Sequence, residues 1–425
     1  MRKCIIAVLL IGAALAVQPF SSICPITHAV EAAPDAAIEA EKQQAEALEV
    51  ETITHLRILS ALYLKQHMFD KAVECLEKIC LPQPDNLDVL NDLVNLALHV
   101  QNYKDAEDPL KKLYDVKPGD RGTLLALAAC YKGLQDEKYG EYLEKADASE
   151  FAGNPYIDSA AYFEQFGMTE LVYAELQKEL DLPLSDPKNS PALRMSALQK
   201  MAFYLSDEAK YAEAAQTYNR LLAEMEQAGL AAIGEYNQTA SQMSYCQAMQ
   251  LERDGKADEA RQKYEKAARL SPDDVDAQGH LYVLLMGQGK TDDAKRVFEA
   301  AEAVLVARTA GETDDSAMNA LSWFYAVTGE KIDEGIRLAQ RAVTSRPDEP
   351  AFLDTLAELY YVKAKSQEDT TQKKGSLTNA IKCASTADAI PKRGNVPYYK
   401  RQFLKMLMEF VRQFGNQEGG SNPLP

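Results

Sequence analysis

Residues 241–274, SQMSYCQAMQLERDGKADEARQKYEKAARLSPDD, are followed directly by residues 275–308, VDAQGHLYVLLMGQGKTDDAKRVFEAAEAVLVAR. The two stretches have the same length, and like residues recur in them 34 positions apart. The pairs at this interval, here and earlier in the chain, are Ala260 and Ala294, Tyr264 and Phe298, Ala72 and Ala106, and Pro84 and Pro118. A fixed interval between like residues indicates a repeat architecture.

The sequence of residues 53–86 predicts the secondary structure of one repeat. Apolar residues recur there at intervals of three and four on both sides of a break at 67–70. This period is typical of amphipathic helices, so the unit is predicted to be two helices folded back on each other. Ala72 is small, which lets the two axes approach to about 8 to 10 Å. Pro84 ends the second helix and starts the next unit.

This pattern resembles the tetratricopeptide repeat family, whose unit is a helix-turn-helix of about 34 residues. Seven units match it well, beginning at residues 53, 87, 195, 241, 275, 316 and 350. Residues 121–190 drift out of phase and are interpreted as two degenerate units. Insertions are expected at 229–240, 304–315 and 366–375. The fold class is therefore predicted to be all-α, an α-solenoid of tetratricopeptide-like hairpins with a C-terminal capping helix.

The repeats divide the chain into an N-terminal array, 53–190, and a C-terminal array, 191–391. Residues 392–414 are predicted to form the capping helix, because a terminal repeat would otherwise leave an apolar face bare. Its apolar residues are assigned to one stripe: Phe403, Leu404, Leu407, Phe410 and Val411. An Ala- and Glu-rich N-terminal helix or linker is expected at 33–52, and a disordered tail at 415–425.

Residues 1–32 have the pattern of a signal peptide. Arg2 and Lys3 precede the uncharged run 4–17, and the small residues Val30 and Ala32 suit a signal peptidase. Cleavage is predicted after Ala32, with the mature protein exported from a bacterial cell to the periplasm or cell envelope, or secreted. The 14-residue run is shorter than the roughly 20 residues that span a bilayer, although an uncleaved anchor stays an alternative. No direct membrane insertion is expected after cleavage.

The net charge of the chain limits the classes of partner that it is expected to bind. With 46 basic and 64 acidic side chains its formal charge is -18, which disfavours nucleic acid and anionic lipid surfaces as main partners. A protein or peptide partner is expected instead, and the oligomeric state is left open. The cysteines that remain after cleavage are odd in number, lack a C-x-x-C pair and are expected to be small buried hydrophobes. They are Cys75, Cys80, Cys130, Cys246 and Cys383.

Three patterns imitate sites of chemistry. Residues 287–291, GQGKT, resemble the end of a phosphate-binding loop, but the Gly required five residues before Gly289 is Leu284. Asp274 opens a stretch like a calcium loop, but Leu285 stands where a bidentate Glu is needed. The histidines that remain after cleavage are dispersed and form no metal-protease or hydrolase motif; they are His55, His67, His99 and His280. No catalytic residue, metal or cofactor is therefore predicted.

The resemblance implies that the first helices of the hairpins line a concave face whose exposed residues select the ligand. The candidate partner-binding residues are Arg57, Asn91, Asn95, Tyr245, Met249, Val283, Met286, Phe324, Val327 and Tyr361. Exposed apolar groups on such a face suit an extended peptide or an amphipathic helix. The alternative is that neighbouring superhelical turns cover them. Phe324→Ser is expected to spare the fold and weaken binding.

The predicted function is a non-enzymatic scaffold for protein–protein interaction in the bacterial cell envelope, binding a peptide or helix. One alternative is an assembly or export factor for a surface polymer or secretion complex. The other is a hydrolase whose site these motifs do not reveal, since a catalytic site can assemble from distant residues.

Overall fold

A computed structural model gives the fold of this chain. It describes Leu56, Leu59, Ser60 and Tyr63, the helix at 69–80, and residues 86–99, 101–183, 185–186, 189–232, 234–309, 314–390 and 396–414. These described residues form eighteen helices and no strand, which confirms the all-α prediction. The predictions for residues 1–32, 33–52 and 415–425 lie outside them.

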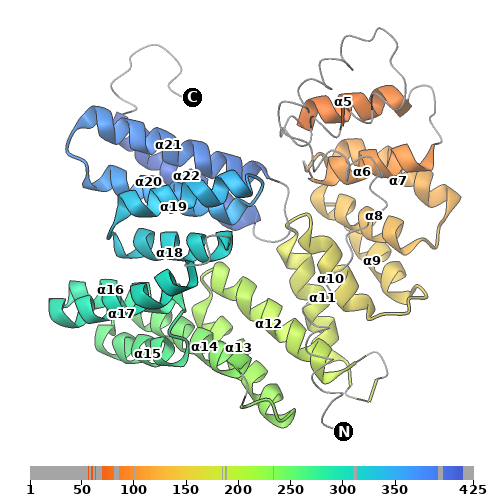
Figure 1. Cartoon of the computed structure of the whole chain (residues 1–425). Coiled ribbons are helices and arrows are strands. Elements are labelled where there is room, and N and C mark those ends of the chain that lie inside the picture. Colours follow the sequence, from red (N-terminus) through yellow and green to blue (C-terminus); the bar gives the residue numbers. More distant parts are fainter. Residues whose placement is uncertain are drawn as a thin grey trace. The chain divides into compact units, whose positions relative to one another are not determined.

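The chain forms two compact units, Met1–Ala192 and Leu193–Pro425. Within each unit, helices that follow each other in sequence pack together as hairpins, and the hairpins stack in chain order (Figure 1). This is the predicted α-solenoid.

The first unit holds α5–α11. The helices are α5 (Phe69–Cys80), α6 (Leu87–His99), α7 (Tyr103–Val116), α8 (Arg121–Gly133), α9 (Lys138–Ala148), α10 (Pro155–Glu164) and α11 (Thr169–Asp181). The out-of-phase stretch after residue 120 folds as two further hairpins, α8 with α9 and α10 with α11. Leu124, Leu127 and Tyr131 of α8 are buried, as their helical spacing predicts.

The second unit holds α12–α22. The helices are α12 (Pro191–Asp207), α13 (Tyr211–Gln227), α14 (Gly234–Arg253), α15 (Ala257–Leu270), α16 (Val275–Gly287), α17 (Thr291–Thr309), α18 (Asp315–Thr328), α19 (Ile332–Ser345), α20 (Pro350–Ser366), α21 (Thr370–Ala389) and α22 (Val396–Phe414). α12 and α13 come first, and four packed hairpins, from α14 with α15 to α20 with α21, precede the capping helix α22.

Small residues stand at the helix crossings, as the repeat requires. Ala260 of α15 and Ala294 of α17 are fully buried where each helix packs on its hairpin partner. Tyr264, four residues after Ala260, is fully buried too. Between the helices, Gly255 and Gly289 adopt φ of +74° and +71°, a left-handed conformation that residues with a side chain rarely adopt. Gly289 therefore belongs to a hairpin turn, not to a phosphate-binding loop.

Two expected insertions are largely helical. α17 continues to Thr309 because Leu305, in its additional turn, is buried in the core. α21 begins at Thr370 because the Asp369 side chain accepts a hydrogen bond from the backbone N–H of Gln372 (2.8 Å) and caps the helix. The additional residues therefore partly lengthen the flanking helices α17 and α21.

Candidate protein-interaction surface

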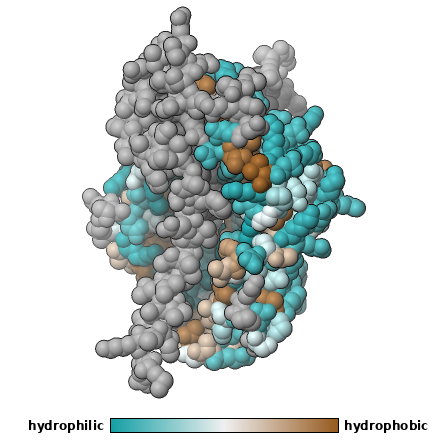
Figure 2. Space-filling model, turned by 90° about the vertical axis from the view of Figure 1, so that its right-hand side faces the viewer, coloured by the Kyte–Doolittle hydropathy of each residue, from teal (hydrophilic) through white to brown (hydrophobic). Residues whose placement is uncertain are grey.

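The first helices of the second unit expose apolar side chains chiefly on α16. Val283 is 44% exposed and Met286 is 43% exposed, and they lie one helical turn apart on one face. Both were predicted to be exposed on the first-helix face. On another side of the molecule, the coloured part of Figure 2 shows brown apolar groups among teal hydrophilic ones.

The neighbouring helix α14 presents less of its predicted face. Tyr245 and Met249 are half-buried and pack against the core of the unit. The Tyr264 hydroxyl lies 2.9 Å from the Met249 sulfur and donates a hydrogen bond to Glu252 Oε2 (2.6 Å). These two contacts hold the side chains of Met249 and Glu252 against α15. The Tyr245 ring meets the His280 ring edge-on, at 5.6 Å between centroids. This part of the face is therefore tied to the core by these contacts and is only partly open.

The following helix α18 packs closely on α16. A side-chain carbon added at Gly279 would lie 2.7 Å from Val327 Cγ1, so the missing side chain is what admits Val327. Val327 is consequently half-buried. Trp323 Nε1 donates to Asp276 Oδ1 across the same pair of helices (2.8 Å). These contacts fix the position of Val283 and Met286 relative to α18.

The start of α16 is also fixed. Asp274 is its N-cap, accepting from the backbone N–H of Ala277 (3.1 Å), from Ser241 Oγ (3.0 Å) and from Gln242 Nε2 (3.0 Å). Burial, with the nearby Asp276 carboxylate second, raises the pKa of Asp274 to about 6. Asp274 therefore has a structural role as the N-cap of α16.

Phe324 was wrongly assigned to the exposed face. It is fully buried, and its ring stacks on Phe298 with 5.2 Å between centroids. The reason is an additional residue in the turn. Gly289 precedes Ala294 by five positions, but Gly329 precedes Gly335 by six, with Lys331 at φ +46°. One residue turns a helical side chain by about 100°, which brings Trp323 to the face and takes Phe324 into the core.

Tyr361 was also wrongly expected to be exposed. It is only 6% exposed because α22 packs over the end of α20, and it belongs to one buried cluster with Met406 and Phe410. The Lys405 ammonium lies 4.7 Å from the centre of its ring. The capping helix therefore covers this last position of the repeat array.

The remaining three candidates fall in the first unit. Asn91 of α6 is exposed and its side-chain amide donates to the Leu87 carbonyl (2.9 Å). Asn95 is half-buried, and its carbonyl oxygen lies 2.9 Å from His99 Nδ1. Arg57 lies outside the described residues. Asn91 and Asn95 thus lie one helical turn apart on α6 of the first unit, while the other described candidates belong to the second unit.

Phe203 on α12 is an exposed apolar residue that the sequence analysis did not select. It is 52% exposed. Its place in the unit that begins at residue 195 equals that of Met249 in the next and Val283 in the one after, so the repeat register could have found it.

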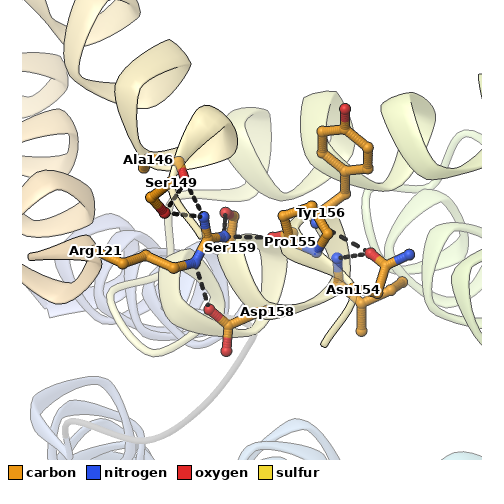
Figure 3. A network of polar contacts seen from close by, with 9 residues as sticks. Arg121, Ala146, Ser149, Asn154, Pro155, Tyr156, Asp158 and Ser159 are labelled. Carbon is orange, nitrogen blue, oxygen red and sulfur yellow. Dashed lines mark hydrogen bonds and ion pairs between the residues drawn. The ribbon is translucent and has the colours of Figure 1, made fainter. Parts of the chain in front are cut away.

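The polar network around Arg121 has a structural role instead (Figure 3). The guanidinium donates to the carbonyl oxygens of Ala146 and Pro155, to Ser159 Oγ (2.7 Å) and to Asp158 Oδ2 (3.1 Å). It thereby joins the start of α8 to the end of α9 and the start of α10. Its donors are directed at groups of the chain itself, so the arrangement is a clamp between hairpins.

Reactive groups are few in the described part of the chain. No cluster of three His, Cys, Asp or Glu side chains there could hold a metal ion. Burial raises the pKa of the thiols of Cys130, Cys246 and Cys383 to about 12, 11 and 11, so they stay protonated and unreactive at neutral pH. Burial also lowers the pKa of His99. Among the described helices, none combines the length and apolarity of a membrane span.

Comparison with known proteins gives one family match. A model described as a tetratricopeptide repeat matches residues 251–309, which run from the end of α14 through α17 and include Val283 and Met286. No curated protein matches the chain.

Three solved structures resemble the chain. The Naa15/Naa10 complex bound to HypK-THB shares 16% identity at a TM-score of 0.30, covering 92% of this chain and 62% of that chain. The yeast Tom70 structure shares 14% at 0.30, covering 90% and 91%. The TPR domain of P58(IPK) shares 14% at 0.22, covering 87% and 99%. The chain thus spans less than two thirds of the length of the first.

The family match falls on the two hairpins that carry the 34-residue interval most clearly. Their buried alanines, glycine turns and aromatic core positions are the features from which the repeat was predicted. Repeats of this kind form scaffolds for protein–protein interaction. Residues 251–309 therefore match the tetratricopeptide-repeat family, and the match covers that part of the chain.

Proposed function

We propose that the protein binds a peptide or a helix of a partner protein on the first-helix face of its second unit, with Val283 and Met286 at the centre of contact. The supporting observation is that these two side chains are exposed on a helix whose other contacts are fixed. A rigid face loses little conformational entropy on binding, and apolar groups on it gain from being covered.

The neighbouring groups suit such a ligand. Trp323 and Tyr245 are half-buried aromatics on the flanking helices, and aromatic and Met side chains are enriched at protein interfaces. Asp276 accepts from Trp323 and Glu252 accepts from Tyr264, which leaves carboxylate oxygens able to accept further hydrogen bonds from a ligand backbone or a basic side chain. The ligand is therefore expected to be apolar with basic or neutral flanks.

Photo-crosslinking in the living cell tests this proposal. A photoreactive phenylalanine analogue replaces Met286 and, as the control, Val306 on the second helix α17, which is 45% exposed. A distinct cross-linked partner at Met286 that is absent at Val306 is the expected result. Equal cross-linking at both positions, or none at Met286, would contradict a role for this face.

The proposed setting of this interaction is outside the bacterial cytoplasm, in the periplasm or cell envelope or beyond it. The signal-peptide pattern of residues 1–32 supports it. Cell fractionation followed by N-terminal sequencing tests it: a mature chain that begins after Ala32 is expected, and a cytoplasmic chain that begins at Met1 would refute the proposal.

A further inference from the structure

The capping helix α22 has two apolar faces. Its inner face packs on α20 and α21, where Met406, Phe410 and Phe414 are buried with Leu377 and Ala380. On the opposite face Leu404 is 41% exposed, Met408 65% and Val411 50%. Leu404 and Val411 were predicted to lie on one stripe with Phe410, and that prediction was wrong. We call Leu404, Met408 and Val411 the outer stripe.

The outer stripe is unusual for a helix that ends a solenoid. Its residues are spaced by four and three positions, so they lie within an arc of about 60° on the helix. Helices that cap a repeat array need a polar outer face, because nothing stacks on them. An apolar stripe that is exposed along about two turns instead predicts another layer of protein.

The stacking order indicates that the missing layer is a helix. α20, the first helix of its hairpin, packs against α18 and α19 of the preceding hairpin, against its own second helix α21, and against α22. α22 packs on α20 and α21 in the same way, as the first helix of a further hairpin would. Residues 415–425 contain one large apolar residue, Leu424, so this segment lacks the apolar stripe that the second helix of such a hairpin needs.

The charge of this end of the chain indicates which helix fits. Residues 361–414 contain 11 Lys and Arg and 4 Asp and Glu, whereas the rest of the chain contains 35 and 60. On α22, Arg401 and Arg412 are exposed on the same side of the outer stripe, about 60 to 80° from Leu404. Arg412 pairs with Glu409 (2.6 Å), and the Arg401 guanidinium donates to the Asp207 carbonyl, which leaves its charge without a carboxylate in that contact.

We propose that the outer stripe binds an acidic amphipathic helix of a partner protein, which completes the hairpin begun by α22. Apolar residues of that helix would cover Leu404, Met408 and Val411, and its Asp or Glu residues would lie beside Arg401 and Arg412. A second copy of this chain fits less well, because α22 packed on α22 would bring four arginines to one seam. This surface is separate from the face of α16, so its occupancy does not depend on the function proposed above.

Binding of synthetic helices to the full chain tests the proposal. The probe is a fluorescein-labelled helix of about 20 residues with Leu along one stripe and Glu on both flanks; the matched probe has Lys in place of each Glu. Fluorescence anisotropy should show the acidic helix binding at least about tenfold more tightly than the basic one. Met408→Glu should abolish this binding and Arg401→Glu should weaken it, while Val306→Glu on α17 should leave it unchanged.

Each competing outcome has its own signature. Equal binding of both probes, or binding that survives Met408→Glu, would overturn the proposal. A dimer in sedimentation that Met408→Glu dissociates, with no binding of the acidic helix, would assign the stripe to a second copy. Binding to phosphatidylserine vesicles under the same conditions would assign it to a membrane surface. Unchanged urea unfolding, followed by the single tryptophan Trp323, verifies that the variants fold.

Discussion

Glu175 of α11 is a fully buried carboxyl group whose replacement should stabilise the first unit at neutral and alkaline pH. Its Oε1 lies 2.8 Å from Lys178 Nζ, and the same ammonium is 2.6 Å from Asp147 Oδ2 of α9. Burial, followed by the nearby Asp147 carboxylate, outweighs the cations Lys178 and Arg121 and raises the pKa of Glu175 from 4.5 to about 7.

This raised pKa makes the free energy of unfolding depend on pH. The folded unit holds a proton that the unfolded chain releases, so the stabilisation is complete below pH 4.5 and is lost as the pH rises through about 7. The difference between the two pKa values corresponds to at most about 3 kcal/mol. Glu175→Gln keeps the shape of the side chain without the ionisation, so its advantage over the wild type should be near zero well below pH 4.5, small at pH 5, and grow toward that value at pH 8.

Hydrogen exchange of the full chain measures this locally, because unfolding of two units together need not be two-state. Peptides from α10 and α11, corrected for intrinsic rates, should open progressively more from pH 5 to 8 in the wild type and much less so in Glu175→Gln. Peptides from α16 and α17 in the second unit serve as the control and should not differ. If the variant keeps the pH dependence of the wild type, or is the less stable protein at pH 8, the reasoning is wrong.

Three further predictions concern packing and the thiols. Phe324→Ala should destabilise the second unit by about 3 to 5 kcal/mol, because it leaves a cavity at a fully buried site. The urea midpoint measured by Trp323 fluorescence should fall, and an unchanged midpoint would contradict the burial of Phe324. Ala260→Leu should overfill the α14–α15 crossing and lower the free energy of unfolding by about 1 to 3 kcal/mol in the same assay. An unchanged stability would contradict the close approach of the two helices. Cys130 and Cys246 should resist maleimide until denaturant is added; rapid labelling of the native protein would contradict their burial.

The repeat fold could be predicted because its determinants are local and periodic. Ala260 and Ala294 mark helix crossings, and Gly255 and Gly289 mark turns, at fixed intervals in the sequence. Those positions are buried or left-handed in the structure as the interval requires. The family match over residues 251–309 falls where these signals are most regular.

The surface was harder to predict, because one residue in a turn rotates a whole helix. The additional residue before α19 changes the register of α18, so Trp323 lies on the first-helix face where Phe324 was predicted. Tyr361 was misassigned for a different reason: α22 covers it, and a helix that docks from beyond the repeats leaves no mark in the repeat pattern. Val283 has no such complication, and its exposure agrees with the prediction.

Contacts between residues far apart in the chain could not be predicted from the sequence pattern. Glu175 and Asp147 belong to different hairpins and converge on Lys178, in the stretch where the repeat is most degenerate. Likewise, the two apolar faces of α22 could not be told apart from helical spacing alone, since apolar residues occur almost all round the helix. Only the packing of Met406 and Phe410 shows which face is covered.

The binding role of the α16 face is tested most directly by the affinity of the cross-linked partner for a double variant, Val283→Asp with Met286→Asp. Both side chains are more than 40% exposed, so the melting of the second unit should stay unchanged. Affinity should fall by at least about a hundredfold, since two apolar contacts are each replaced by a charge that binding would bury. The control variant Val306→Asp should bind like the wild type. Full affinity in the double variant would contradict the account.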